Sequence, residues 1–337
     1  MNFIQPIQMI GTQRSGSNLL RLLLNQYKEV VAPHPPHILQ RFYPLLPAYG
    51  DLSNNENMAR LIDDVCILVE KNPVPWIGIS LDRQEILKEC KNNTLIEIFR
   101  VIYDKMAISH QASMWLCKSM ANVHFAGEME KEGLKPLYIY LYRDGRDVAC
   151  SFKKAIVGEK HVYHIAKEWR KNQLACLELK KRTAAERFIG SSYEDLIHAP
   201  EKEMIRLSEF LHLKFDPAIL NYYNSEESKN TSTAGIMWAN VVKPIMTDNK
   251  RKFLDELTHE EIVIFESVAG DVLELLGYDL QFPEESAQLV INDGDIVEYD
   301  IQNKILKEKS NLLADPEGMK LRVGQDELMK SIKNRIM

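Results

Sequence analysis

Residues 3–24 constrain the fold more than any other part of this chain. Residues 3–10 are mostly apolar and predict a strand that runs into Gly11. Gly16 follows five positions later, and either Ser17 or Asn18 is suited to cap a helix. That helix carries leucines at positions 19, 20, 22, 23 and 24. A strand, a tight loop and a helix in this order predict an α/β fold.

The same order of strand and helix recurs along the chain without an internal repeat. Strands are predicted at residues 113–117, 137–142 and 187–192, and helices at residues 94–109, 147–155, 161–182 and 262–275. Residues 32–47 are rich in proline and histidine and predict a loop or a broken helix. The alternation favours a parallel sheet covered by helices, with ligands outside the carboxyl ends of the strands.

The regular spacing of apolar residues ends near residue 280, because Gly277 ends the last helix in which that spacing is strong. A length of 337 residues suits one large α/β domain or two modest ones. We expect one domain over residues 1–280 and a helical C-terminal extension over residues 281–337, packed on the domain or at an interface. Within the extension, apolar residues at positions 301, 305, 306, 312 and 313 predict a short amphipathic helix.

Composition narrows the classes of partner. The net charge of −6 argues against a broad surface that binds nucleic acid or anionic membranes. Any polyanion must therefore bind in a local basic pocket. The five cysteines are widely spaced without a CxxC pair, which predicts reduced and mostly buried thiols. Residues 1–12 lack the basic start and continuous apolar stretch of a signal peptide, and no later segment approaches ~18 uninterrupted apolar residues. We therefore expect a cytoplasmic protein without a membrane span.

The loop between Gly11 and Asn18 reads Gly-Thr-Gln-Arg-Ser-Gly-Ser-Asn and is shaped to hold an anion. Its two glycines let the backbone bend around a phosphate, and the following helix directs free N–H groups at it. Ser17 and Asn18 stand where a nucleoside-triphosphate loop requires Lys followed by Ser or Thr. Arg14 could instead hold phosphate or sulfate oxygens. Alternatively, the loop only joins a strand to a helix and Arg14 is solvated.

A second anion-binding pattern follows the strand predicted at residues 137–142. Arg143 would emerge at the carboxyl end of that strand, and Ser151, eight residues later, could return a hydroxyl to the same anion from the next helix. Two donors would then converge on one phosphate.

Together these segments resemble the sulfotransferase family. Residues 12–18 look like that family's 5′-phosphosulfate loop in its arginine-bearing form, found in many bacterial and Golgi members. Residues 143–148 with Ser151 resemble its 3′-phosphate motif, and residues 193–196 resemble the tyrosine-containing segment beside the adenine. The three matches occur in the family's order and cover roughly residues 8–200.

The resemblance implies a P-loop-NTPase-like, three-layer α/β fold with a central parallel sheet. It also implies transfer of a sulfuryl group from 3′-phosphoadenosine 5′-phosphosulfate (PAPS) to an acceptor, without a metal. Arg143 and Ser151 would hold the 3′-phosphate and Tyr193 would contact adenine. The 5′ side of the donor would be bound by Arg14, Ser15, Gly16, Ser17 and Asn18.

Sulfuryl transfer needs positive charge near the reacting oxygens and a base for the acceptor's proton. We assign the charge to Arg14 and to Lys118, which follows the predicted strand 113–117 where family members often bring a lysine. Histidine suits the base because its pKa lies near ~6.5. His34 is the preferred base, His37 is a near equal and His124 ranks third. Arginine-loop relatives often place a catalytic carboxylate in the loop after the first helix, where this chain has His34 and His37. Each could equally be an ordinary packed or surface residue.

Several alternatives remain open. The spacings His34-x-x-His37 and His161-x-x-His164 would suit a metal, but no cysteine or acidic cluster accompanies them. Trp169 is predicted to pack in the core, and residues 229–244 around Trp238 to form a lid. The acceptor is a small molecule or glycan whose identity the pattern does not give, and a homodimer is compatible with it. The rival functions are a P-loop-type nucleotide kinase and an inactive nucleotide-binding or assembly protein.

Overall fold

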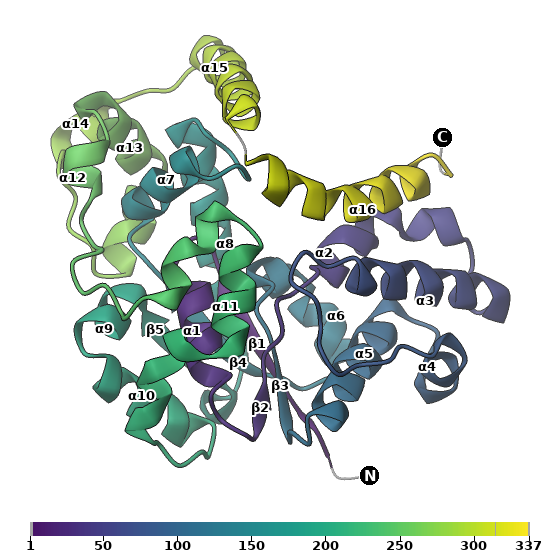
Figure 1. The fold of residues 1–337 in the computed structure, drawn as a ribbon. Helices are drawn as coiled ribbons and strands as arrows, with labels where there is room; N and C mark the ends of the chain where they lie inside the picture. Colours follow the sequence, from purple (N-terminus) through teal and green to yellow (C-terminus); the bar gives the residue numbers. More distant parts are fainter. Residues whose placement is uncertain (1–2, 314, 336–337) are drawn as a thin grey trace.

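The computed structural model describes residues 3–313 and 315–335, including their side chains except at positions 236, 237 and 317. Its centre is a five-stranded parallel sheet with the strand order β2-β3-β1-β4-β5 (Figure 1). The strands are β1 (Gln5–Gly11), β2 (Val30–Val31), β3 (Met114–Cys117), β4 (Leu137–Tyr142) and β5 (Phe188–Ser192). The predicted parallel α/β fold is confirmed, and the sheet gains the short strand β2, which lies within no predicted element.

Helices cover both faces of the sheet because successive strand residues point to opposite sides. Tyr138 and Tyr140 of β4 face one apolar cluster, whereas Ile139 and Leu141 face another. The first cluster contains α2 (Ile38–Phe42), α3 (Asn55–Glu70), α4 (Arg83–Glu89), α5 (Leu95–Ser109) and α6 (Ala126–Lys131). The second contains α1 (Ser17–Leu24), α9 (Tyr193–His198) and α10 (Pro200–Phe210). The three-layer arrangement is therefore built from alternating buried side chains.

A third apolar cluster lies beside the sheet, on the side of β4 and β5. It joins α7 (Gly145–Lys154), α8 (Val162–Arg182), α12 (Phe253–Glu256) and α13 (His259–Leu275). Trp169 is fully buried there, as predicted, and its Nε1 donates to the carbonyl of Arg143 at 3.2 Å. Gly277, at a φ of 83°, follows α13 as expected. This cluster fixes the backbone from which Arg143 projects.

Short 3-10 helices join these elements. They are η1 (Tyr43–Tyr49), η2 (Met120–Phe125), η3 (Ala185–Arg187), η4 (Pro217–Asn224) and η5 (Ile236–Val242). Residues 32–37 have no regular structure and residues 38–49 form α2 and η1, in agreement with the loop or broken helix predicted over residues 32–47. The segment around Trp238, where a lid is predicted, is helical: α11 (Glu226–Thr233) precedes η5, which contains Trp238. Thr231 of α11 is held by the buried Arg21, whose Nη2 donates to its hydroxyl at 2.7 Å.

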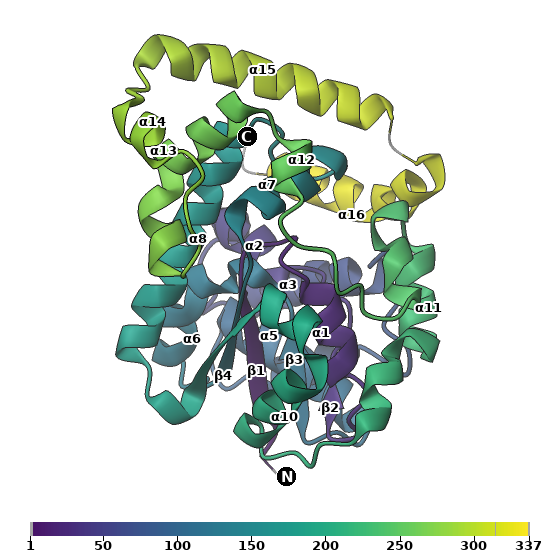
Figure 2. The ribbon, with the colours of Figure 1, turned by 90° about the vertical axis from the view of Figure 1, so that its left-hand side faces the viewer.

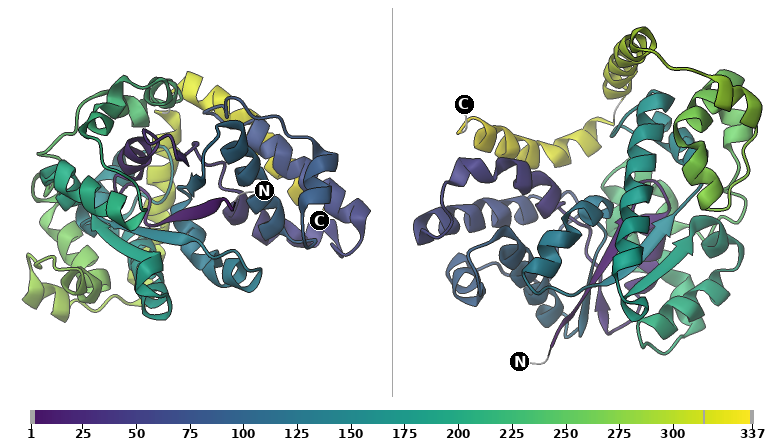
Figure 3. Two further views of the ribbon diagram at one scale, coloured as in Figure 1. Left: turned by 90° about the horizontal axis from the view of Figure 1, so that it is seen from below. Right: turned by 180° about the vertical axis from the view of Figure 1, so that it is seen from behind.

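The C-terminal part of the chain is helical, with α14 (Pro283–Gln288), α15 (Asp293–Leu312) and α16 (Pro316–Lys333). Helices α15 and α16 lie at the end of the molecule toward which β1 runs, opposite the N-terminus (Figures 1 and 2). Seen from behind, α15 projects from the body while α16 returns across it (Figure 3). The apolar side chains expected to make α15 amphipathic remain largely exposed, 55% at Ile301 and 87% at Leu312. Instead, the Asn303 side chain ties α15 to the body by accepting from the N–H of Lys160 at 2.8 Å.

Within the described residues, none of the helices combines the length and apolar character that crossing a lipid bilayer requires. Four of the five cysteines are buried, as expected, and Cys90 is partly exposed. The division of the chain at residue 280 stays a prediction.

Candidate active site

The loop after β1 is bent by two glycines whose backbone conformations other residues rarely adopt. Gly11 has a φ of 136° and Gly16 a φ of 84°. A Cβ at Gly16 would overlap the ring of Tyr193, so this position also needs the absence of a side chain. Gly16 itself is the N-cap of α1, without a side-chain cap, and the prediction that Ser17 or Asn18 caps the helix is wrong. The left-handed turn at Gly16 places the start of α1 directly against Tyr193.

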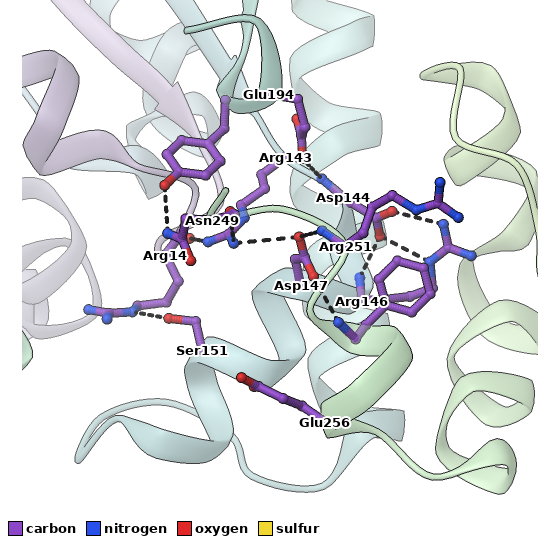
Figure 4. A network of polar contacts seen from close by, with 12 residues as sticks. Arg14, Arg143, Asp144, Arg146, Asp147, Ser151, Glu194, Asn249, Arg251 and Glu256 are labelled. Carbon is purple, nitrogen blue, oxygen red and sulfur yellow. Dashed lines mark hydrogen bonds and ion pairs between the residues drawn. The ribbon is translucent and has the colours of Figure 1, made fainter. Parts of the chain in front are cut away.

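Arg14 and Ser151 are 137 residues apart in the sequence but lie in contact. Arg14 Nε donates to Ser151 Oγ at 2.9 Å, and Arg143 Nη1 approaches the carbonyl of Arg14 at 3.3 Å (Figure 4). Burial lowers the pKa of Arg14, and the nearby charge of Arg143 lowers it further. The structure thus brings the two predicted anion-binding segments together at the carboxyl ends of β1 and β4. Ser151 bonds with Arg14, whereas the sequence paired it with Arg143.

Arg143 is the centre of a second set of contacts (Figure 4). Its guanidinium carbon lies 4.4 Å from the centroid of the Tyr193 ring, and its Nη2 is 3.5 Å from Asp147 Oδ2. Nη2 also donates to the carbonyl of Asn249 at 3.0 Å, and the amide of Asn249 donates to Tyr193 Oη at 2.7 Å. Asp147 accepts the N–H of Arg251 at 2.7 Å and so anchors residues 249–251 to the site.

The second arginine of the same motif has a structural role. Arg146 Nη2 pairs with Asp144 at 2.8 Å and its Nη1 with Glu266 at 2.5 Å, while its guanidinium covers the Phe253 ring. The turn from β4 into α7 thus directs Arg143 toward the cleft and Arg146 into the protein.

Lys118, His34 and His37 line the same cleft as the arginines. Lys118 follows β3 and is 8% exposed, and burial, followed by the charges of Arg21 and Arg14, lowers its pKa to about 7. His34 is 6% exposed, and burial lowers its pKa well below 6.5, with a further contribution from Lys118. Burial and Lys118 likewise lower the pKa of His37 to about 3. Both imidazoles are therefore neutral at pH 7 and each has a lone pair.

The remaining histidine candidates have other partners. His124 lies outside the residues that line the cleft, and its Nε2 is 2.7 Å from Asn172 Oδ1. His161 stacks on Tyr299, and His164 lies 3.1 Å from Asp300. No group of three or more potential metal ligands is found among residues 3–313 and 315–335.

A cleft of about 1000 Å³ connects these side chains. Ligand pockets are commonly about 300–1,000 Å³, so the cleft is large for a single small molecule. Ser15 is fully buried and does not line the cleft. The other predicted site residues line it: Arg14, Gly16, Ser17, Asn18, His34, His37, Lys118, Arg143, Ser151 and Tyr193. The cleft is locally basic in an acidic chain. Its lining has seven lysines and arginines against three carboxylates: Arg14, Arg41, Lys118, Arg143, Lys154, Lys252 and Arg322 against Asp147, Glu256 and Asp315.

Two parts of the lining were missed in the sequence. Asn249 and Lys252 come from the segment held by Asp147, and the consecutive basic residues 250–252 were a usable signal for it. Helix α16 contributes Gly318, Arg322 and Gln325, although its sequence contains no recognisable ligand-binding pattern. Trp238 of η5 also lines the cleft, close to His34.

Comparisons with known proteins agree on one family. The model of the Sulfotransferase family matches residues 6–217, and no curated protein matches the sequence significantly. The sulfotransferase domain of the Synechococcus PCC 7002 olefin synthase is similar in structure, with a TM-score of 0.54 and 22% identity. That alignment covers 83% of this chain and 97% of the domain.

The sulfotransferase domain from the curacin biosynthetic pathway has a TM-score of 0.53 and 20% identity. Its alignment covers 83% of this chain and all of that domain. At these identities the structures establish a shared fold, and the family match covers more than half of the chain. The chain therefore belongs to the sulfotransferase family.

Proposed function

We propose that this protein transfers the sulfuryl group of PAPS to a hydroxyl or amine of a small-molecule or glycan acceptor and releases adenosine 3′,5′-bisphosphate. The observation that carries the proposal is the meeting of Arg14, Ser151 and Arg143 at the mouth of two strand-to-helix loops. Arginine and hydroxyl donors at a helix N-terminus suit phosphate and sulfate oxygens.

The residues present fit a nucleotide with two separate anionic groups. Among the described residues, three buried atoms of these loops have no hydrogen-bond partner: Ser15 Oγ, Asn18 Oδ1 and Arg143 Nε. Buried polar groups are normally paired, so these atoms mark a place where a polar ligand would be stabilised. The 5′ side would be held by residues 14–18, the 3′-phosphate by Arg143 and Ser151, and the adenine by the Tyr193 ring.

The transfer itself forms a bond between sulfur and the acceptor atom and breaks the bond between sulfur and the bridging phosphate oxygen. The acceptor's proton passes to a base, and the electron pair of the broken bond stays on the phosphate. PAPS supplies the activated sulfuryl group. His34 is the preferred base because it is neutral, lines the cleft and has no hydrogen-bond partner on either ring nitrogen among the described residues. His37 remains its near equal.

Arg14 and Lys118 would stabilise the negative charge that develops on the leaving phosphate. The pKa of Lys118, about 7 in the protein alone, would rise beside an anion because opposite charges favour the charged form. Lys118 would therefore be protonated when the reaction needs its charge. The same anion would raise the low pKa of His34 and make it a stronger base.

The P-loop kinase reading is disfavoured because Ser17 and Asn18 replace the Lys and Ser or Thr that position nucleoside triphosphates and Mg²⁺. The deciding experiment incubates the protein with PAPS and a panel of phenol, sugar and amine acceptors in EDTA. Mass spectrometry should detect a sulfated product together with adenosine 3′,5′-bisphosphate. Hydrolysis of ATP that depends on Mg²⁺ would favour the kinase instead, and bisphosphate binding without any turnover would favour an inactive binding protein.

A further inference from the structure

Three side chains from distant parts of the sequence, those of His34, Trp238 and Arg322, pack in a row, and His34 is the proposed base. The ring of His34 packs edge-on against Trp238 of η5, with 4.8 Å between the ring centroids. The guanidinium of Arg322, on α16, lies over the same Trp238 ring at 5.6 Å from its centroid. The row thus runs from the loop before α2, through η5, to the C-terminal helix.

The orientation of the His34 ring depends on packing in this row, because no hydrogen bond holds the ring. Neither Nδ1 nor Nε2 has a hydrogen-bond partner among the described residues, so no such bond fixes the orientation of the ring. A catalytic imidazole is normally oriented by a partner on its second nitrogen. Here Trp238 is the aromatic ring in contact with that imidazole, and Arg322 lies on Trp238.

A second route also leads from α16 to His34, through its backbone. Gln325 Nε2 donates to the carbonyl of Leu68 at 2.8 Å and reaches Asn72 Oδ1 at 3.5 Å. Asn72 Nδ2 in turn donates to the carbonyl of His34 at 2.9 Å, which also accepts from Trp76 Nε1 at 2.7 Å. Hydrogen bonds from Asn72 and Trp76 therefore hold the backbone of His34, whereas the orientation of its ring depends on packing against Trp238.

Helix α16 is well placed for this role. Gly318, Arg322 and Gln325 recur at three- and four-residue steps and so share the face of α16 that lines the cleft. A Cβ at Gly318 would lie 3.7 Å from the Cα of Gly235, which precedes η5. The far end of the helix is anchored by the burial of Leu328 and Ile332 in the main core and by a 2.6 Å ion pair from Arg335 to Asp64.

We propose that Arg322 is a positioning residue of the sulfotransferase reaction: through Trp238 it orients the ring of His34, which makes α16 part of the catalytic machinery. The proposal rests on the proposed function in taking His34 as the base. Trp238 and α16 lie beyond residues 6–217, so the match to the family does not assign this role.

The charge of Arg322 acts on the same site. Burial and the charges of Lys118, Arg21 and His37 lower the pKa of His34, and Arg322 adds a smaller effect in the same direction. Burial, Lys118 and Arg41 lower the pKa of His37, and Arg322 again adds a smaller effect. Replacing Arg322 by glutamine should therefore raise the pKa of both histidines, whereas Arg322→Lys would keep most of the charge and lose the flat contact with Trp238.

The test uses the full chain labelled with ¹³C at histidine Cε1 and compares Arg322→Gln and Arg322→Lys with Lys330→Gln. Lys330 is exposed on the same helix and lies outside the residues that line the cleft. The resonance of His34, assigned from its loss in His34→Ala, should move in both Arg322 variants because the ring current of Trp238 changes. It should stay in place in Lys330→Gln.

With an acceptor in hand, Arg322→Gln should lower kcat by about 10- to 10²-fold, the range for a misplaced reacting group, and leave the KM for PAPS unchanged. Trp238→Phe, which keeps an aromatic ring, provides a second variant if Arg322→Gln fails to fold. An unmoved His34 resonance in folded Arg322 variants overturns the proposal. Failure of the wild-type protein to bind adenosine 3′,5′-bisphosphate would instead overturn the proposed function, and the resonance experiment does not depend on it.

Discussion

Replacing Arg143 by alanine tests the proposed 3′-phosphate site most severely. The guanidinium is buried between Tyr193 and Asp147, where water screens its charge little. A hydrogen bond to a charged group contributes about 1.5–3 kcal/mol. At about 1.4 kcal/mol per factor of ten, Arg143→Ala should weaken the binding of adenosine 3′,5′-bisphosphate by about 10- to 150-fold.

The assay is isothermal titration calorimetry, with AMP as the matched control ligand because it lacks the 3′-phosphate. The affinity for AMP should change little, so the variant should lose its discrimination between the two nucleotides. Arg170→Ala, which removes a partly exposed arginine paired with Asp271 outside the cleft, is the control variant. Unchanged bisphosphate affinity in a folded Arg143→Ala protein, or equal weakening of AMP, would refute the assignment.

The remaining predictions concern the loop, the base and Lys118. His34→Ala should preserve bisphosphate binding and slow transfer by ~10²-fold or more; if only His37→Ala slows it, the base is His37. Gly16→Ala should abolish measurable bisphosphate binding, because its Cβ would overlap the Tyr193 ring and its φ is 84°; retained affinity in calorimetry would show that the loop can rearrange. Lys118→Met should flatten the pH dependence of unfolding. With a pKa of about 7 when folded and 10.5 when unfolded, Lys118 makes the unfolded state bind more protons between these values, so its contribution to stability rises with pH there. Denaturant titrations from pH 7 to 10 should show a smaller rise in the variant, and identical slopes would contradict the low pKa.

The sheet was predictable because its strands are short apolar runs that lead directly into glycine loops or helices. Local pattern placed β1, β3, β4 and β5 to within a residue or two at each end. Strand β2 was not predictable in the same way, because two valines carry too little pattern to separate a strand from a loop. The same limit applies to the cap of α1, which depends on the left-handed turn at Gly16 and its contact with Tyr193.

The donor side of the site was more predictable than the acceptor side. Arg14 and Arg143 follow the ends of neighbouring strands, where the geometry of a parallel sheet brings them together, and Ser151 lies in α7, the helix that follows β4. Trp238, Arg322 and Gln325 reach the cleft only through the packing of η5 and α16, and no spacing in the sequence connects position 34 with position 322. Long-range packing of this kind leaves no local signal.

The most direct test of the account is calorimetric titration of the wild-type protein with adenosine 3′,5′-bisphosphate, ADP and AMP in EDTA. The account predicts tight binding that is selective for the bisphosphate, because Arg143 and the loop at residues 14–18 would each hold one of its phosphates. Equal affinities for the three nucleotides, or no binding, would contradict it, and ATP with Mg²⁺ would then be the ligand to examine.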